Sequence, residues 1–502
     1  MNRREVLLLS AGAGVVGALT LEPVSFAHAG TGGGTAGETA RTVRGRLPAG
    51  APDYVYLPVE VPDGTREIAV SYRYDKPEVP PGTPGNALDI GMFDERGTRL
   101  GGRGFRGWSG GARTEFAISA EQATPGYLAG PVRAGTWHVV LGPYTVAPQG
   151  LAYEVTVTLR SGAPGHTPKP VYPPERAKGR GRAWYRGDCH LHTVHSDGKR
   201  TPADVAAAAR AAGLDFLTST DHNTTSAHPA WDGLWGDDLL VLLGEEATTR
   251  NGHYLALGTD PDTFVDWRYR ARDGEFAHFA RRIRRAGGLV VPAHPHCPFV
   301  ACQWKSGYAH ADAVEVWNGP WTADDELSLA AWDNMLVTDD DWLPAMGNSD
   351  AHREGQDVGL PQTVVQAEDL TRPALLEGIR RGRCYVAESA HISVRLAASG
   401  PHGEHAGIGE RLDVADDAPV AVRLEVTGAP EGATAHLWTD EGLMHAEPVP
   451  DSGAVTWRTT AAQSTYVRAE VRRPAPGGES SPLPGPMAAM TNPVWLARRR
   501  HH

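Results

Sequence analysis

The feature that most constrains this chain is a series of histidines and acids that recurs between residues 187 and 352. It begins with His190 and His192, which follow a short apolar segment of strand character. Residues i and i+2 of a strand point to the same face, so both imidazoles project together, at the spacing that two ligands of one metal ion need. Asp197 follows in the adjoining loop. Taken alone the pair is weak evidence, because paired histidines on a strand often face solvent or make core hydrogen bonds.

Residues 183–390 alternate between short apolar segments and helical patterns. One helix start is clear at Thr201, with Pro202 in the first helical position and Asp204 in the first turn. Further helices are expected near residues 276–286 and 323–336. This alternation predicts a parallel, barrel-like α/β domain, in which reactive side chains gather at the C-terminal ends of the strands.

The expected strands of this region end, one after another, in side chains that can bind metal. They are His190, His192 and Asp197, then Asp221 and His222, Glu245 and Glu246, His253, His294 and His296, and finally Asp350 and His352. A cap, a turn or a core hydrogen bond explains any one of these groups. Six such groups in succession favour a metal centre.

This series resembles the PHP (polymerase and histidinol phosphatase) family over roughly residues 184–390. The resemblance implies a distorted (β/α)7 barrel with two or three divalent ions. The implied ligands are His190, His192, Asp197, His222, Glu245, His253, His294, Asp350 and His352. Glu245 takes the place of the acid that bridges the metals.

The family also implies how these ligands are grouped. One ion takes His190, His192, Glu245 and Asp350, a second takes Glu245, His253 and His294, and a third takes Asp197, His222 and His352. Nitrogen and oxygen donors without thiolate suit Zn²⁺, Mn²⁺ or Fe²⁺. Bound ions of this kind would lower the pKa of a bridging water so that the resulting hydroxide can attack phosphorus or a carbonyl carbon.

Four other polar residues are candidates for catalytic roles: Asp221, His195, His296 and Arg353. Asp221 is expected to orient a metal-bound histidine, the usual role of a carboxylate beside a metal site. His195 and His296 are open between substrate contact and support of a ligand. Arg353 could contact the substrate.

Three functions remain open from the sequence. The first is an exported hydrolase of phosphoesters. The second keeps the metals but cleaves carbamates or carboxylic esters, because an exported barrel flanked by β domains resembles the carbaryl-hydrolase-like branch of the family. The third is a surface-binding protein without catalysis. The expected partner is a small-molecule or polymer-linked ester.

The flanking regions are predicted to be β-sandwiches. Residues 41–160 and 391–502 carry short alternating segments separated by turn residues. Residues 161–182, rich in Gly, Pro and basic side chains, are expected to form a linker between the first sandwich and the barrel. The second sandwich should be the smaller.

Residues 1–29 have the pattern of an export signal. An arginine pair at positions 3 and 4 precedes an apolar run and an A-x-A cleavage pattern at residues 27–29. The pair resembles a twin-arginine signal, although an ordinary secretory signal or an uncleaved anchor shares these parts. Export to the cell surface or medium is therefore expected, with a polar linker at residues 30–40.

Charge, hydropathy and cysteine content restrict the possible partners and metal sites of this chain. The net charge of -12 argues against a general nucleic-acid binder, and no segment after the signal is long and apolar enough to span a membrane. Cys297 and Cys302 are five residues apart and can form a disulfide or stay as thiols. Without a C-x-x-C motif, a cysteine-rich zinc site is not expected.

Overall fold

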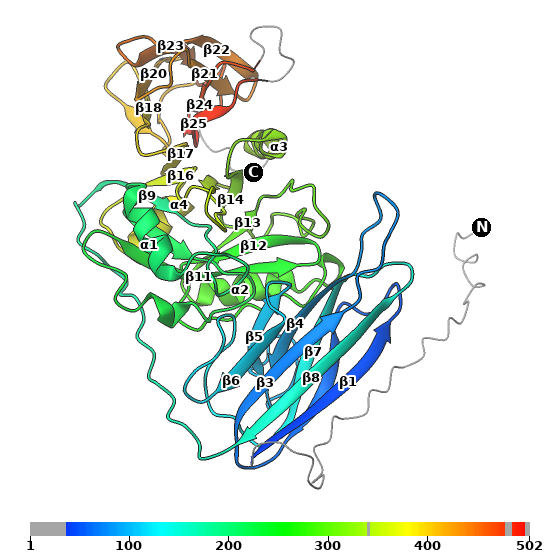
Figure 1. The fold of residues 1–502 in the computed structure, drawn as a ribbon. Coiled ribbons are helices and arrows are strands. Elements are labelled where there is room, and N and C mark those ends of the chain that lie inside the picture. Colours follow the sequence, from blue (N-terminus) through cyan, green and yellow to red (C-terminus); the bar gives the residue numbers. More distant parts are fainter. Residues whose placement is uncertain (1–36, 339–341, 477–483, 497–502) are drawn as a thin grey trace, which may run out of the picture.

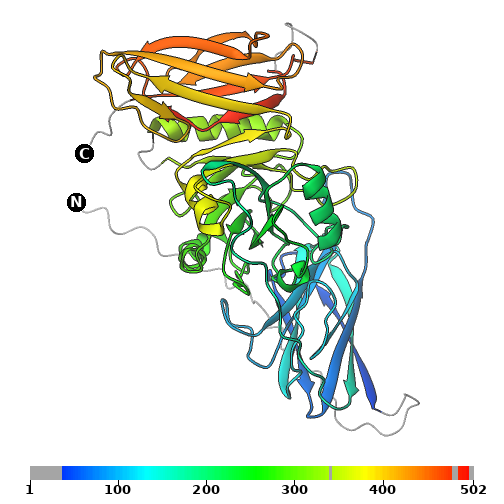
Figure 2. The ribbon, with the colours of Figure 1, turned by 90° about the vertical axis from the view of Figure 1, so that its left-hand side faces the viewer.

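The computed structural model describes residues 37–338, 342–476 and 484–496. The expected export signal, residues 1–29, lies outside the described residues. Figures 1 and 2 show an elongated arrangement, with an N-terminal β-sandwich at one end, a central α/β region, and a C-terminal β region at the other end. No helix in the described part of the chain is long and apolar enough to cross a membrane.

The N-terminal region is a sandwich of two four-stranded antiparallel sheets. One sheet has the order β1 (Glu38–Leu47), β8 (Leu151–Ser161), β3 (Thr65–Tyr74), β6 (Glu115–Ser119), and the other β2 (Val55–Val61), β7 (Gly135–Thr145), β4 (Ala87–Phe93), β5 (Phe105–Gly110). Alternate residues of β2 and β8 are buried between the sheets, as an alternating sequence requires. Residues 38–40, expected in a linker, belong to β1 because they pair with the end of β8.

The central region is built on a mixed sheet. Its strands run in the order β13 (Leu289–Ala293), β12 (Gly252–Leu257), β11 (Leu240–Thr249), β10 (Phe216–Ser219), β9 (Ala183–Asp188), β16 (Gln362–Ala367), β17 (Cys384–Ala387). Only β9, β10 and β11 are mutually parallel, while β12, β13, β16 and β17 are antiparallel to their neighbours. A separate parallel pair is formed by β14 (Val314–Asn318) and β15 (Ala345–Asn348).

The predicted (β/α)7 barrel is therefore not what the strand pairing shows. Among the described residues the hydrogen-bonded sheet ends at β13, and β14 and β15 form their own ladder. A single bridge between Leu191, just past β9, and Ala351, just past β15, brings these two strand ends together. The sequence pattern correctly indicated strand ends that converge, but the tight turn after Thr249 makes an antiparallel hairpin instead of a parallel crossover.

Four α-helices accompany these strands: α1 (Pro202–Ala211), α2 (Phe276–Arg285), α3 (Ala323–Thr338) and α4 (Arg372–Arg380). Two short 3₁₀ turns lie at His228–Trp231 and Ala271–Asp273. The start of α1 is the predicted one, because the Thr201 hydroxyl accepts from the Asp204 backbone N–H while the Asp204 carboxylate accepts from the Thr201 N–H. This reciprocal cap fixes the helix directly after the loop that carries Asp197.

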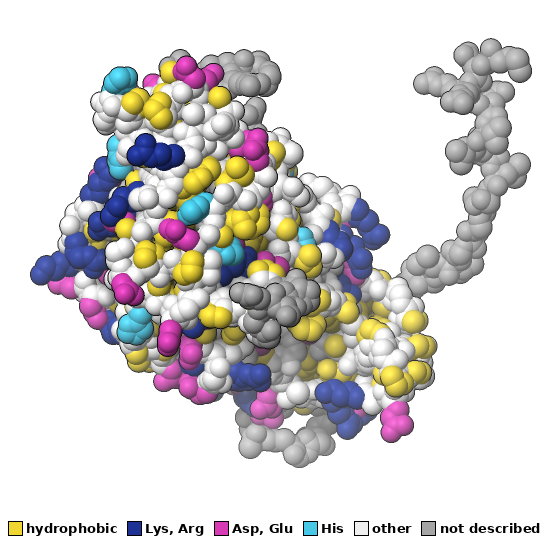
Figure 3. Space-filling view, turned by 90° about the horizontal axis from the view of Figure 1, so that it is seen from above, with side chains coloured by type: hydrophobic (Ala, Val, Ile, Leu, Met, Phe, Trp, Pro, Cys, Tyr) yellow, Lys and Arg dark blue, Asp and Glu magenta, His cyan; other side chains and the backbone are white. Residues whose placement is uncertain are grey.

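The C-terminal region is joined to the central sheet. One sheet has the order β19 (His405–Gly407), β18 (Ser393–Ser399), β20 (Pro419–Thr427), β23 (Ala454–Thr460). The other contains β21 (Thr434–Thr439), β22 (Gly442–Pro448), β24 (Tyr466–Arg472), β25 (Met487–Thr491) and β26 (Val494–Trp495). Because β25 pairs with β17, one sheet runs across the expected boundary at residue 390. Figure 3 shows acidic and basic side chains interspersed on the face seen from above.

Candidate metal centre and adjoining cavity

Four buried ligand atoms converge just beyond the ends of the central strands. His190 Nε2 and His192 Nε2 lie 3.2 and 3.3 Å from Glu246 Oε2, and 3.3 and 3.0 Å from Asp350 Oδ1. Among the described residues, none of these four atoms has a hydrogen-bond partner. Ligand atoms about 2.0–2.2 Å from one ion lie roughly 3.0–3.6 Å apart, so the spacing and the donor chemistry both fit a divalent metal.

Glu315 fixes the orientation of His190. Its carboxylate lies 3.1 Å from His190 Nδ1, and it also accepts from the His294 backbone N–H and from the side-chain amides of Asn318 and Asn348. With Nδ1–H directed at this carboxylate, His190 presents Nε2 to the convergent group. A carboxylate behind a histidine is the usual support of a metal ligand. Glu315 lies on β14 and was not singled out from the sequence.

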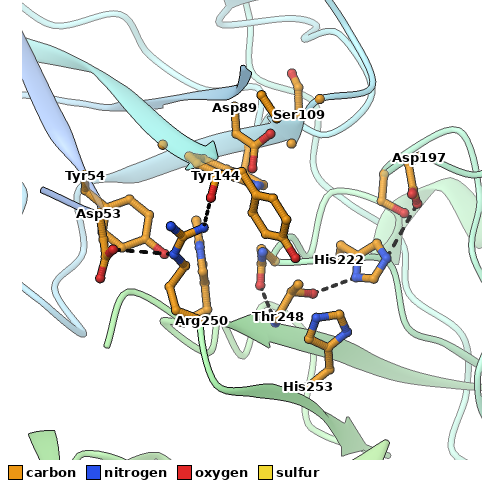
Figure 4. A pocket seen from close by; sticks show the side chains of 18 residues that line it. Asp53, Tyr54, Asp89, Ser109, Tyr144, Asp197, His222, Thr248, Arg250 and His253 are labelled. Atoms are coloured by element: carbon orange, nitrogen blue, oxygen red, sulfur yellow. Dashed lines mark hydrogen bonds and ion pairs between the residues drawn. The ribbon is translucent and has the colours of Figure 1, made fainter. Parts of the chain in front are cut away.

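A second group surrounds Asp197. His352 Nε2 and His222 Nε2 lie 3.3 and 3.6 Å from Asp197 Oδ1. These residues and His192 offer ligand atoms that all lie within 4.8 Å of one another. Behind His222, the Thr248 hydroxyl lies 2.6 Å from Nδ1, which leaves Nε2 directed at Asp197 (Figure 4). The structure thus brings together the residues expected to form the third ion site.

His253 and His294 complete the cluster. His253 Nδ1 and His294 Nε2 lie 3.0 and 3.2 Å from Glu246 Oε1. Cys302 Sγ approaches His294 Nδ1 at 3.5 Å, but it is bonded to Cys297, so it offers no thiolate. His294 and Asp350 adopt positive φ values of 30° and 50°, uncommon for residues other than glycine. Backbone strain of this kind concentrates at functional sites.

Glu246, not Glu245, is the acid at the centre of the cluster. The two residues are adjacent on β11, so they point to opposite faces of the strand. Glu246 faces the histidines, whereas Glu245 points away and accepts a hydrogen bond from the Val265 backbone N–H at 2.8 Å. The assignment of Glu245 as the bridging acid is therefore wrong by one residue.

The pKa values of these residues follow from their burial and from the charged side chains close to them. Burial alone would lower the pKa of His190, but Asp350, Glu315 and Glu246 outweigh it and raise that pKa. Burial would raise the pKa of Glu246, but His222 and His190 hold it well below its usual range. Burial lowers the pKa of His253 to about 4, which keeps this imidazole neutral, as a metal ligand must be.

The pKa of Glu245 is shifted in the opposite direction to that of Glu246. Burial raises its pKa well above the ordinary value, and the Val265 N–H and the charge of Arg282 offset this only in part. An acid that faces away from the histidines is not placed to hold a metal with them.

The four residues proposed for catalytic roles lie at the edge of this cluster. Asp221 accepts from the backbone and hydroxyl of Thr193 and from the Ser196 hydroxyl, so it shapes the loop and reaches His192 only through Ser196. His195 Nδ1 lies 2.9 Å from the Ser226 hydroxyl, and His296 Nδ1 lies 3.2 Å from that of Ser328. Arg353 has an exposed side chain. The expected support of a metal-site histidine by Asp221 therefore runs through the Ser196 hydroxyl.

A cavity of about 280 Å³ adjoins the second group of ligands. Its central-region wall includes Asp197, His222 and His253, and its other wall comes from the N-terminal sandwich, with Asp89 and Tyr144 (Figure 4). Trp108 of the sandwich also lines the cavity. The sequence patterns did not point to the sandwich residues, because no local signal marks a side chain whose partner lies in another domain.

The similarity of this chain to known proteins is low. A scan against protein-family models matched none, and a search of the curated proteins matched none. Among solved structures, similarity was found to a two-domain protein containing a predicted PHP-like metal-dependent phosphoesterase from Bacteroides vulgatus, with 16% identity, a TM-score of 0.33, and coverage of 62% of this chain and 95% of that one. An amidohydrolase from Chromobacterium violaceum with bound sulfate is 22% identical, with a TM-score of 0.24 and coverage of 34% and 89%.

Proposed function

We propose that this chain is a metal-dependent hydrolase of PHP type that binds two or three divalent ions. The observation that carries the proposal is the convergence of His190 Nε2, His192 Nε2, Glu246 Oε2 and Asp350 Oδ1, all buried and without hydrogen-bond partners. Buried polar atoms are normally paired, and a cation at their centre would satisfy all four.

The chain's own residues prepare this centre for hydrolysis. Glu315 and Thr248 hold His190 and His222 in fixed orientations, so little reorganisation is needed when a substrate binds. Divalent ions held there would supply Lewis acidity and an activated water. Glu246 lies between the histidines of all three predicted groups, which makes it the side chain suited to link neighbouring ions.

For the bond cleaved, we propose a phosphoester, on the strength of the sequence resemblance to the PHP family. A carboxylic ester or carbamate is the second candidate. It is favoured by the cavity lining, which is rich in aromatic side chains, while its one arginine among the described lining residues, Arg250, is directed at Asp53 and at backbone carbonyls. A phosphate dianion would find little positive charge there.

The test is a metal count combined with a substrate panel. The full chain, purified with added Mn²⁺ or Zn²⁺, is offered an aryl phosphodiester, an aryl phosphomonoester, an aryl carboxylic ester and an aryl carbamate. We expect at least two bound ions per chain and turnover of a phosphoester. Carbamate or ester cleavage without phosphoester turnover would replace the first substrate class by the second. A protein that takes up no metal would overturn the proposal.

Glu246 and Glu245 offer a matched pair of variants. Glu246→Gln should lower kcat/KM by at least about 10³-fold, since several kcal/mol of charge stabilisation are lost with the ligand. Glu245→Gln should retain near-normal activity, because Glu245 faces away from the histidines and the glutamine oxygen can still accept from the Val265 N–H. Metal analysis of both proteins accompanies the kinetics, and equal losses in the two variants would contradict the assignment.

We also propose that the protein is exported, as residues 1–29 indicate. The Cys297–Cys302 bond supports this, because disulfides persist mainly in oxidising compartments. Processing at the expected cleavage site can be read from the N-terminal residue of protein recovered from the medium or cell surface. Protein that stays inside the cell with its first residues intact would contradict the proposal.

A further inference from the structure

The cavity beside the metal cluster is shared by two regions of the chain. Asp89 on β4 faces His222 and Asp197 across it (Figure 4), and Trp108 on β5 also lines it. The N-terminal sandwich therefore contributes a wall of the substrate site. What this wall can recognise follows from its side chains.

Asp89 is a carboxylate without a partner at this wall. Among the described residues, no side chain or backbone N–H donates a hydrogen bond to it, and no cation pairs with it. Its strand neighbour across β7 is Gly142, so no side chain at that position covers it. Burial raises the pKa of Asp89 to about 7, and the charges of Arg250 and His222 oppose this shift only in part.

Aromatic rings stand around this carboxylate. Trp108 lies 4.9 Å from Trp267 and 6.3 Å from Tyr54, measured between ring centroids, and all three line the cavity together with Tyr144. Trp108 reaches its position because Gly142 has no side chain: a Cβ there would lie 2.6 Å from the indole. The faces of such rings attract cations, and tryptophan does so most strongly.

The arginine that lines the cavity, Arg250, binds other groups. Arg250 donates to the backbone carbonyls of Tyr144 and Pro143, at 2.8 and 3.2 Å, and pairs with Asp53 at 3.4 Å. Its guanidinium lies 5.0 Å from the centroid of the Tyr144 ring and occupies one side of it. Its charge lowers the pKa of Asp89 in part, but no ion pair among the described residues joins the two, so a ligand can still balance the charge on Asp89.

We propose that the cavity binds a compact cationic group of the substrate, a quaternary or protonated ammonium, between Asp89 and the rings of Tyr54, Trp108 and Tyr144. This inference rests on the proposed function and adds to it the cationic group that lies beside the scissile bond of the substrate. The volume of about 280 Å³ suits a small alkylammonium with one aromatic or aliphatic substituent. An ester of an amino alcohol has this chemistry, whether its acid is a phosphate or a carboxylate.

The test measures binding and needs no turnover. Benzyltrimethylammonium is titrated into the metal-loaded full chain by calorimetry, beside its uncharged isostere neopentylbenzene and the anion phenylphosphonate. A quaternary ammonium has no lone pair, so it cannot bind as a metal ligand. We expect the cation to bind at least about tenfold more tightly than the uncharged isostere.

Two variants locate the site. Asp89→Asn should weaken binding of the cation at least about tenfold while leaving the metal content unchanged. The matched control, Asp63→Asn, changes an exposed acid of the same sandwich and should bind as the wild type does. Equal binding of cation and isostere, an equal loss of cation and phenylphosphonate affinity in Asp89→Asn, or an unaffected Asp89→Asn would each overturn the inference. Cation binding in a protein that hydrolyses none of the panel would instead overturn the proposed function alone.

Discussion

The two β regions meet the central region in different ways. The N-terminal sandwich joins it through side chains, such as the stacked rings of Phe105 and Phe264 with centroids 4.1 Å apart, which both pack on the cavity residue Trp267. The C-terminal region joins it through backbone, where β25 extends the central sheet beside β17. One attachment brings side chains to the site, and the other extends the scaffold behind it.

A buried ion network reinforces the C-terminal attachment. Glu470 on β24 lies between Arg468 and Arg472, at 2.5 and 2.6 Å, and these arginines reach Asp333 and Glu326 of α3. None of these residues lines the cavity. The comparison teaches that similar β folds occupy different places here: the N-terminal one supplies a wall of the cavity, and the C-terminal one extends the central sheet.

The largest effect is expected for a substitution in the C-terminal attachment. Glu470→Ala leaves two buried arginines without their shared acid, and breaking such pairs costs about 3 kcal/mol. We expect the free energy of unfolding in urea to fall by this amount, while affinity for benzyltrimethylammonium and metal content of the folded protein stay unchanged. The control Glu425→Ala removes half of an exposed pair with Arg423 and should change stability by less than about 1 kcal/mol. Loss of cation binding in Glu470→Ala would contradict the distinction drawn between the two attachments.

A smaller effect is expected at the other attachment. Phe264→Leu removes the ring that stacks on Phe105, which should cost about 1 kcal/mol of stability and loosen the sandwich wall. We expect affinity for benzyltrimethylammonium to fall about threefold, measured by calorimetry. Phe299→Leu, at an exposed ring of the central region, is the control and should change neither quantity. If Phe264→Leu destabilises the protein without altering affinity, the N-terminal sandwich acts as scaffold only.

The last expected effect concerns the pH dependence of stability. The pKa of Asp89 is about 7 in the folded protein and near its ordinary value of 3.8 when unfolded. Between these values the folded state keeps a proton that the unfolded state has lost, so the stability that Asp89 contributes falls as pH rises towards 7. Asp89→Asn should therefore raise the melting temperature relative to wild type more at about pH 8.5 than at about pH 5, by about 2–4 °C for each kcal/mol.

Scanning calorimetry without added ammonium measures this difference. Asp63→Asn should show no change in its difference from wild type between the two pH values. A melting temperature difference for Asp89→Asn that is flat with pH would show that Asp89 is not held in an unfavourable environment.

The sequence by itself determined the kinds of ligand and the segments that carry them. His190 and His192 were placed by strand periodicity, and α1 by its cap, because both signals are local in the chain. Only the tertiary structure decided between Glu245 and Glu246, since adjacent residues of a strand face opposite ways and a shift of one residue exchanges them. It also supplied Glu315 and Asp89, and it showed one sheet crossing the boundary at residue 390. These features depend on contacts between segments far apart in sequence, and local periodicity contains no record of such contacts.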